Sequence, residues 1–400
     1  MRNAAPLQVE SNAVRAEKIR KAAVQDKCQQ SLALTPYSRA CTRAADSIGY
    51  PSTHVAGFVA RITVIFLRLT IVIKGAHIPR EDKRYFDRPQ LLRANNQLRK
   101  RPMQHKLKHK FRDATAPFRV LPDFLIIGAQ KSGTSSLYYY LTQHPQVAAA
   151  RGFIDSQKEV RFFTRHFKQD TTWYRRHFPL SVHKRLFERL HGQPLLSGES
   201  TPSYVYFPHA LERIARAVPE AKLILLLRDP VERAFSHYRH AIRSGVEHLT
   251  FPQAIRVEEE RLRGEEERLW EDENYTSFSF GYHSYLKRGL YAEQIERVFS
   301  YFPRDQVLIL ESADFFGNPQ EAYDSVLAFL QLPGHQLKGY QKVNAAPRSE
   351  DMDSATRMRL QAYFHPHNEK LFRLLGRRFE WQEPASATEA YAATGTHERA

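Results

Sequence analysis

The chain has 400 residues, of which 42% are hydrophobic, so it is long and apolar enough for a large core in one or more domains. Its net charge of +17 is uneven: residues 1–120 hold 24 Lys and Arg against 8 Asp and Glu, while residues 121–400 hold 36 against 35. This balance argues against nucleic-acid binding by the larger part of the chain. Both cysteines, Cys28 and Cys41, precede residue 121, which excludes disulfides and thiolate metal sites from the rest and fits a reducing compartment.

Residues 1–120 are expected to form a basic, poorly ordered extension. The apolar run 55–73 is long enough to span a bilayer, but Arg61 and Arg68 interrupt it on one helical face. An amphipathic helix at a membrane surface is the functional alternative to a poorly ordered extension. The basic stretch 80–119 could likewise contact anionic lipid, although a solvated linker is the commoner outcome. No standard secretory signal peptide is visible, so a cytoplasmic location is expected, with a membrane-associated or Golgi location through residues 55–73 as the alternative.

Residues 121–383 carry the pattern of an α/β domain, and residues 384–400 that of a disordered tail. Short apolar runs predict buried strands at 123–129, 221–228 and 305–312. Strands that alternate with helices indicate a central parallel sheet flanked by helices. Helices are expected at 135–144, 209–218, 230–245, 251–273, 284–303, 318–333 and 353–376, and the charged 251–273 is taken as a solvated surface.

The first strand leads into GAQKSGTSSL, residues 128–137. Gly128 and Gly133 keep the glycine spacing of a nucleotide phosphate loop, but Thr134 stands where the lysine should be, and Lys131 comes two residues before Gly133. Backbone N–H groups and the helix dipole would still attract an anion there. Hydroxyls of Thr134, Ser135 and Ser136 could add donors at the helix start. A helix cap alone would leave the lysine unexplained.

A second candidate site follows the second strand, where Arg228 stands at the carboxyl end. Ligands bind at this edge of open α/β sheets, and arginine suits bidentate phosphate recognition. Asp229 is interpreted as a helix N-cap rather than a magnesium ligand, so no Mg²⁺ carboxylate is evident. Ser236 lies eight residues after Arg228, within the following helix.

A third stretch, QKEVRFF at 157–163, sets Glu159 before two phenylalanines. A carboxylate against aromatic rings could have the raised basicity that a general base needs. The alternative is a surface glutamate paired with Lys158 or Arg161, and this residue alone favours that alternative.

Taken together, these motifs resemble the sulfotransferases that use 3′-phosphoadenosine 5′-phosphosulfate. GAQKSGTSSL resembles their 5′-phosphosulfate loop, and RDPVERAFSHY (228–238) resembles their 3′-phosphate segment. KEVRFF (158–163), TTWYRRHFP (171–179) and the stretch 360–381 resemble the heparan sulfate N- and 3-O-sulfotransferase branch and its bacterial-type relatives. The resemblance covers about residues 121–382 and implies the P-loop-like sulfotransferase fold.

The resemblance also implies roles. Lys131 would contact the sulfate and bridging oxygen of the donor, and Glu159 would be the catalytic base. The donor-binding residues would be Lys131, Ser132, Gly133, Thr134, Ser135, Ser136, Arg228 and Ser236, with Lys342 and Arg348 as further candidates. Ser200 stands where the animal enzymes commonly carry a lysine, and Asn344 where they carry an arginine, so the acceptor is not specified beyond a hydroxyl or amine, with a saccharide favoured. No metal is expected, because lysine, arginine and N–H groups can supply the electrostatics.

Three alternatives remain open from the sequence. A kinase-like phosphotransferase would also use a strand, loop and helix, and magnesium dependence would identify it. A glycosyltransferase is suggested by Asp351 and Asp353, but the pair directly precedes Ser354 and a predicted helix, which favours capping. A non-enzymatic polyanion-binding protein is suggested by the basic charge of residues 1–120.

Overall fold

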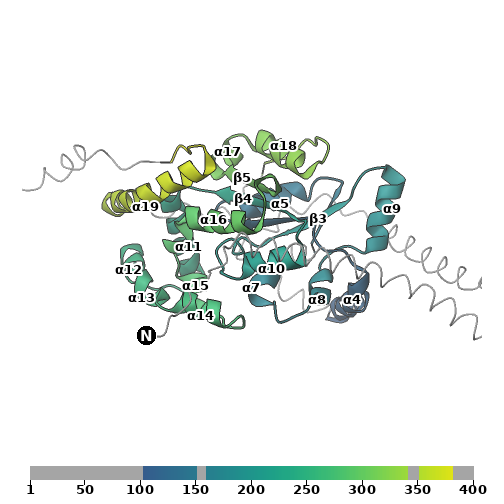
Figure 1. The fold of residues 1–400 in the computed structure, drawn as a ribbon, viewed down its shortest axis with the longest axis horizontal. Coiled ribbons are helices and arrows are strands. Elements are labelled where there is room, and N and C mark those ends of the chain that lie inside the picture. Colours follow the sequence, from purple (N-terminus) through teal and green to yellow (C-terminus); the bar gives the residue numbers. More distant parts are fainter. Residues whose placement is uncertain (1–101, 151–158, 341–350, 382–400) are drawn as a thin grey trace, which may run out of the picture. The chain divides into compact units, whose positions relative to one another are not determined.

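The fold is built on one five-stranded, fully parallel sheet, seen at the centre of Figure 1. It comes from a computed structural model that describes residues 102–150, 159–340 and 351–381. The strands lie in the order β2-β3-β1-β4-β5. Their bounds are β1 Phe124–Gly128, β2 Val147–Ala149, β3 Leu196–Ser200, β4 Lys222–Leu227 and β5 Val307–Glu311. The three strands expected from apolar runs are thereby confirmed, and β2 and β3 are additions.

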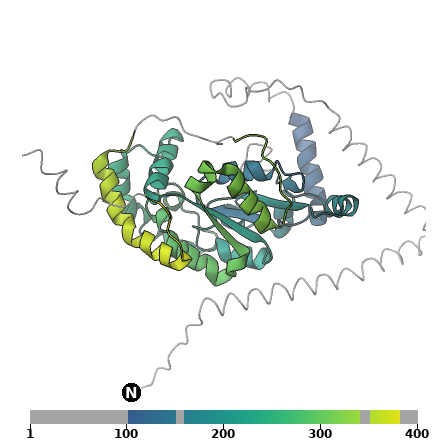
Figure 2. The same cartoon turned by 90° about the horizontal axis from the view of Figure 1, so that it is seen from above.

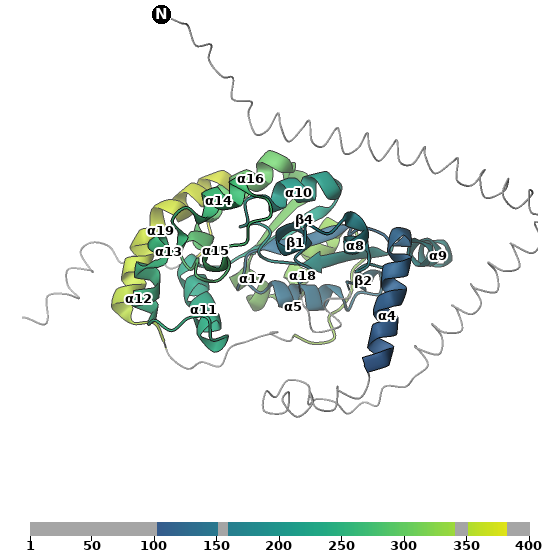
Figure 3. The same ribbon diagram turned by 90° about the horizontal axis from the view of Figure 1, so that it is seen from below.

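Each face of the sheet is covered by its own hydrophobic cluster. Alternate side chains of β1 and β4 point to opposite faces, as the period of a strand requires. Leu125 and Leu223 pack with α10 (Ala210–Ala217) and α16 (Tyr291–Tyr301). On the other face, Ile126 and Ile224 pack with α5 (Thr134–Leu141), α17 (Ser312–Gly317) and α18 (Pro319–Leu330). Figure 3 shows these helices above and below the strands, which confirms the two-sided α/β architecture.

The remaining helices lie at the ends and edges of the sheet. The long helix α19 (Ser354–Leu375), yellow in Figure 2, contacts α16 and α11 (Pro230–Arg243). The others are α4 Pro102–Thr115, η1 Ala116–Phe118, α7 Phe162–Arg165, α8 Thr171–Arg175, α9 Ser181–His191, α15 Phe278–Tyr282, η2 Lys287–Gly289 and η3 Arg304–Gln306. None of the helices in the described ranges is long and apolar enough to cross a membrane. The apolar run 55–73 lies outside those ranges, as does the segment 384–400.

The prediction of one charged helix over 251–273 is wrong. The segment forms three short helices, α12 Phe251–Arg256, α13 Glu258–Leu262 and α14 Glu265–Glu271. The breaks fall at Val257 and at Gly264, whose φ of 71° ends a right-handed helix. Glu258 is not on a solvated face either: its buried carboxylate accepts hydrogen bonds from the backbone N–H of Leu286 and Lys287. The single helix expected over 284–303 is likewise a short η2 turn followed by α16.

Candidate active site

The phosphate loop, residues 128–136, leaves the middle strand of the sheet. β1 pairs with β3 on one side and with β4 on the other, so the loop emerges at the carboxyl edge where the connections change direction. That position is where open α/β sheets bind ligands. The N–H of Ala129 donates to the carbonyl of Leu226 at 2.8 Å, which ties the start of the loop to β4. The loop then turns into α5 at Thr134.

The conformation of the loop depends on Gly133, which precedes α5 with a φ of 102°. A Cβ at this position would lie 2.9 Å from two ring carbons of Phe316. Lys131 also has a positive φ, 75°. The backbone therefore turns sharply into α5, and the first N–H groups of a helix have no carbonyl partner within it.

The hydroxyl groups of the loop are mostly buried. Ser132, Thr134 and Ser136 are buried, and Ser135 is partly exposed. The Oγ of Ser132 is buried without a hydrogen-bond partner in the described part of the chain. An orphaned hydroxyl beside open N–H groups is a feature that an anionic ligand would satisfy. The donor group inferred from the sequence therefore fits these residues.

Arg228 lies beside the phosphate loop. It directly follows β4, and its Nη1 donates to the carbonyl oxygen of Lys131 at 3.4 Å. Its Nη2 forms an ion pair with Glu232 Oε2 at 3.3 Å, and about a third of its side chain is exposed. The hydroxyl of Tyr291 donates to the Arg228 carbonyl at 2.9 Å. The structure thus brings together the two phosphate-binding elements that the sequence suggested.

Two acidic residues considered in the sequence have capping roles. The carboxylate of Asp229 accepts from the N–H groups of Val231 and Glu232, at 2.8 and 3.1 Å. Asp353 accepts from the N–H of Thr356 at 2.7 Å and begins α19. Both capping interpretations are confirmed. Within residues 102–150, 159–340 and 351–381, no group of three or more His, Cys, Asp or Glu side chains is placed to hold a metal ion.

Glu159 forms an ion pair with Arg161, Nε to Oε2 at 2.6 Å, with about a quarter of the glutamate side chain exposed. The ion pair raised as the alternative for this residue is thus present. Burial lowers the pKa of Arg288 to about 10, and the negative charge of Glu159 is among the influences that raise it again. Glu159 therefore lies within electrostatic reach of a buried cation.

The other candidate residues are less closely connected. Ser236 is half-buried on α11, two turns into the helix, and no hydrogen bond within the described ranges joins it to the phosphate loop. Lys342 and Arg348 lie outside the described residues.

A buried cationic group next to the phosphate loop was missed by sequence reasoning. Arg233 and Arg288 are buried, as is His237 one helical turn after Arg233. The Nε and Nη1 of Arg233 have no hydrogen-bond partner among the described residues, although Nη2 donates to the carbonyl of Tyr285. Burial lowers the pKa of His237 well below its usual value, and the charges of Arg233, Arg288 and Lys131 lower it further. The charges of Lys131, Arg233 and Arg288 all act on His237, so this region is positively charged, which favours a bound anion.

A signal for this group existed in the sequence. Arg233 and His237 share one face of α11 with Val231 and Ala234, which are buried. Charged residues on the apolar face of an amphipathic helix indicate a buried role.

The sequence profile of the Sulfotransferase domain family matches residues 121–362, more than half of the chain. The chain belongs to this family. The match includes the phosphate loop, Glu159 and Arg228. With the five-stranded parallel sheet, it confirms the P-loop-like sulfotransferase fold and an enzyme that transfers sulfuryl groups. A kinase-like phosphotransferase is not favoured.

Several characterised proteins are similar to the chain. Membrane-associated sulfotransferase kil1 of Dictyostelium discoideum is 29% identical over 66% of this chain and 67% of its own length. Human bifunctional heparan sulfate N-deacetylase/N-sulfotransferase 3 is 30% identical over 64% of this chain, but the match spans only 30% of that protein. A crystal structure of a sulfotransferase from Alicyclobacillus acidocaldarius is 30% identical and covers 65% of this chain and 98% of its own, with a TM-score of 0.49. The relatives of the chain thus include a heparan sulfate sulfotransferase.

Proposed function

We propose that the protein transfers the sulfuryl group of 3′-phosphoadenosine 5′-phosphosulfate to a hydroxyl or amine of a saccharide by in-line displacement. The observation that carries this proposal is the contact between Arg228 and the Lys131 carbonyl. It sets a guanidinium suited to a 3′-phosphate beside a loop suited to a 5′-phosphosulfate. A nucleotide with phosphate groups on both its 3′ and 5′ positions matches that pair of sites.

The loop residues would bind the 5′-phosphate of the donor. N–H groups at the start of α5 and the hydroxyls of Ser132, Thr134, Ser135 and Ser136 are the donors available there. Arg228, released from Glu232, and Ser236 would bind the 3′-phosphate. Lys342 and Arg348 are kept as further donor ligands on the resemblance alone.

Lys131 and Glu159 would act at opposite ends of the displacement. The acceptor oxygen or nitrogen forms a bond to sulfur as the bond between sulfur and the bridging oxygen breaks. Lys131 stabilises the negative charge that grows on the leaving oxygen, which explains its offset position in the loop. Glu159 accepts the proton that the acceptor loses.

The acceptor and the location of the enzyme are proposals as well. A saccharide is favoured because the relatives named above include a heparan sulfate enzyme. A cytoplasmic enzyme remains the prediction from the sequence, with membrane association through residues 55–73 as its alternative, and the name of the kil1 relative favours that alternative.

Two substitutions test the roles of Lys131 and Glu159 with sulfur-labelled donor and fully desulfated heparin, which offers free amines and hydroxyls. Lys131→Ala should lower the single-turnover rate about a hundredfold or more, as with other lost transition-state contacts. Glu159→Gln should lower it about a hundred- to ten-thousandfold and leave donor affinity nearly unchanged, because a base is not a phosphate ligand.

The controls are Lys168→Ala and Glu259→Gln, which remove exposed charges and should leave the rate unchanged. An exposed ion pair is worth under about 1 kcal/mol. If Glu159→Gln turns over like the parent protein, Glu159 is only the partner of Arg161, and the assignment of the base is wrong.

A further inference from the structure

The carboxylate of Glu199 is a second acidic group close to the proposed base. It lies on β3 and is buried, with hydrogen-bond donors on both oxygens. The hydroxyls of Tyr174 and Tyr204 donate to Oε1, each at 2.7 Å. The hydroxyl of Thr201 donates to Oε2 at 2.7 Å, and the N–H of Val160 donates to it at 3.3 Å. We call these five residues the Glu199 network.

The stability of the fold alone does not explain this arrangement. Burial raises the pKa of Glu199, and the four hydrogen bonds act against that rise. A buried carboxylate is costly in free energy, and no ion pair joins Glu199 to a cation within the described residues. An apolar side chain would fill the same space at a lower cost. The groups that hydrogen-bond to this carboxylate therefore indicate its role.

Glu199 and Thr201 hold the backbone that directly follows Glu159. The N–H of Val160 donates to Glu199, and the N–H of Arg161 donates to the Thr201 hydroxyl at 3.2 Å. Arg161 has a φ of 55°, a left-handed conformation that an arginine adopts at a cost. Two consecutive amides are thus fixed from outside their own segment, where the backbone is strained.

The aromatic rings of the Glu199 network fix the next two residues. The ring of Phe162 stacks on Tyr174, with centroids 4.4 Å apart. Phe163 packs edge-on against Tyr174 and Tyr204, at 5.1 and 5.3 Å. Each tyrosine therefore packs against this segment with its ring and donates to Glu199 with its hydroxyl. This double use joins the segment 159–163 to Tyr174 of α8 and to the residues that follow Glu199 on β3.

The same network is attached to the strand that carries the phosphate loop. The N–H of Thr201 donates to the carbonyl of Ile126 at 3.1 Å, and the N–H of Val205 donates to that of Ile127 at 3.0 Å. Both carbonyls belong to β1, which leads within a few residues to Lys131. The Glu199 network therefore connects the segment of the base to the strand of the leaving-group lysine.

We propose that Glu199, acting through Thr201, is a positioning residue that fixes Glu159 relative to Lys131 for the in-line transfer. The proposal rests on the base role of Glu159 given above. In-line displacement requires both groups in a fixed relation, and a misplacement of about 1 Å can cost about a hundredfold in rate. No residue of the Glu199 network is among the donor-binding residues proposed above.

The test uses Thr201→Val, because Glu199→Ala would leave several buried donors unpaired and could prevent folding. Valine keeps the shape of threonine but removes one donor to Glu199 and the acceptor of the Arg161 N–H. We expect faster hydrogen exchange at the amides of 160 and 161. With desulfated heparin as acceptor, we expect a single-turnover rate about ten- to a hundredfold lower. Affinity for 3′-phosphoadenosine 5′-phosphate should stay within about threefold, and Thr201→Ser should restore exchange and rate.

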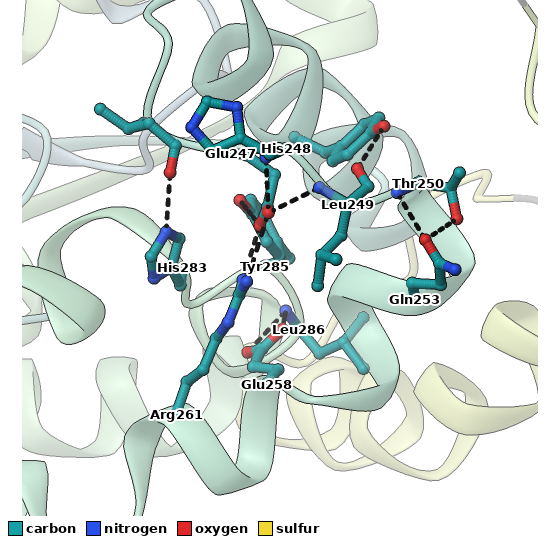
Figure 4. Close-up of polar contacts among 12 residues, drawn as sticks. Glu247, His248, Leu249, Thr250, Gln253, Glu258, Arg261, His283, Tyr285 and Leu286 are labelled. Atoms are coloured by element: carbon teal, nitrogen blue, oxygen red, sulfur yellow. Dashed lines mark hydrogen bonds and ion pairs between the residues drawn. The ribbon is translucent and has the colours of Figure 1, made fainter.

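A matched control lies at another buried carboxylate, Glu247, shown in Figure 4. Tyr285 is buried like Tyr174, and its hydroxyl donates to Glu247 at 2.9 Å, beside the ion pair with Arg261 at 2.6 Å. Tyr174→Phe and Tyr285→Phe each remove one phenolic hydrogen bond to a buried carboxylate. Both should lower the melting temperature, but only Tyr174→Phe should slow transfer.

Unchanged exchange at 160 and 161 in Thr201→Val would overturn the proposal. So would a loss of donor affinity as large as the loss of rate, or an equal slowing by Tyr285→Phe, since each would indicate a general effect on folding. The base role of Glu159 is judged separately by Glu159→Gln. If that variant loses activity while Thr201→Val turns over normally, positioning by Glu199 is wrong and the proposed function stands.

Discussion

Gly133 determines the conformation of the phosphate loop. Its positive φ turns the chain into α5, and its missing Cβ leaves room for Phe316. Lys131 stands two residues before this glycine, whereas the lysine of a nucleotide triphosphatase loop directly follows it. In the proposed reaction this offset suits a phosphosulfate, in which the charge to be stabilised grows close to the 5′-phosphate.

We expect Gly133→Ala to impair donor binding by at least about tenfold. Alanine is disfavoured at positive φ by about 1–2 kcal/mol, and its methyl group would overlap Phe316, so the loop must shift. The measurement is the affinity for 3′-phosphoadenosine 5′-phosphate by calorimetry.

Gly264→Ala is the control, since Gly264 has a φ of 71° but a Cβ there would meet nothing within 4 Å. Gly264→Ala should lower the melting temperature and leave the donor affinity unchanged. Equal donor affinity in the two variants and the parent protein would show that the loop tolerates a side chain at 133.

At the scale of elements, the sequence predicts what is encoded locally. The apolar runs of β1, β4 and β5 and the caps at Asp229 and Asp353 were all expected and are present. β3 was not expected, because its sequence LSGES is polar. Its polar side chains are buried by partners from elsewhere in the chain, as the two tyrosines that bond to Glu199 illustrate.

The candidate site was also predicted only where its residues have a local sequence signal. The loop lysine and Arg228 each stand at the end of an apolar run, and the sheet brings them together. The local pattern around Glu159 fits both a catalytic base and the ion pair with Arg161. The prediction of a base therefore depended on the resemblance of the motif to the family. Arg233 and Glu199 were missed because burial of a charge depends on contacts between segments distant in sequence. The helix break at Gly264 had a local signal, the glycine itself, which the prediction of one helix over 251–273 did not use.

At the scale of the whole molecule, the proposed division is a basic extension over 1–120, a sulfotransferase domain over 121–383 and a tail over 384–400. The structure adds contacts just before residue 121. Arg119 is buried and donates to the Phe178 carbonyl at 2.6 Å, and Asp113 forms an ion pair with Arg176 at 3.0 Å. The last turn of α4 and η1 therefore pack on the segment that carries α8.

We predict that a chain of residues 112–383 folds and binds the donor like the full chain, whereas residues 121–383 melt at a lower temperature. The shorter chain loses the buried contacts of Ala116 and Arg119. Thermal unfolding and donor affinity of both chains are the measurements. Loss of donor binding by the longer chain would show that the basic segment 1–111 belongs to the donor site, as a polyanion-binding protein would require.

The central claim is that this site recognises a nucleotide by its 3′-phosphate through Arg228. Thermal unfolding with 3′-phosphoadenosine 5′-phosphate, adenosine 5′-phosphate and ATP, all without magnesium, tests it most directly. A ligand that binds only the folded state stabilises it by about 2.7 kcal/mol at a hundred times its dissociation constant. We predict a clear rise in melting temperature with the 3′-phosphorylated nucleotide and a much smaller one with the other two. In Arg228→Ala, the rise in melting temperature caused by 3′-phosphoadenosine 5′-phosphate should fall to that caused by adenosine 5′-phosphate. Equal shifts from all three nucleotides, or a rise with ATP that requires magnesium, would contradict the account.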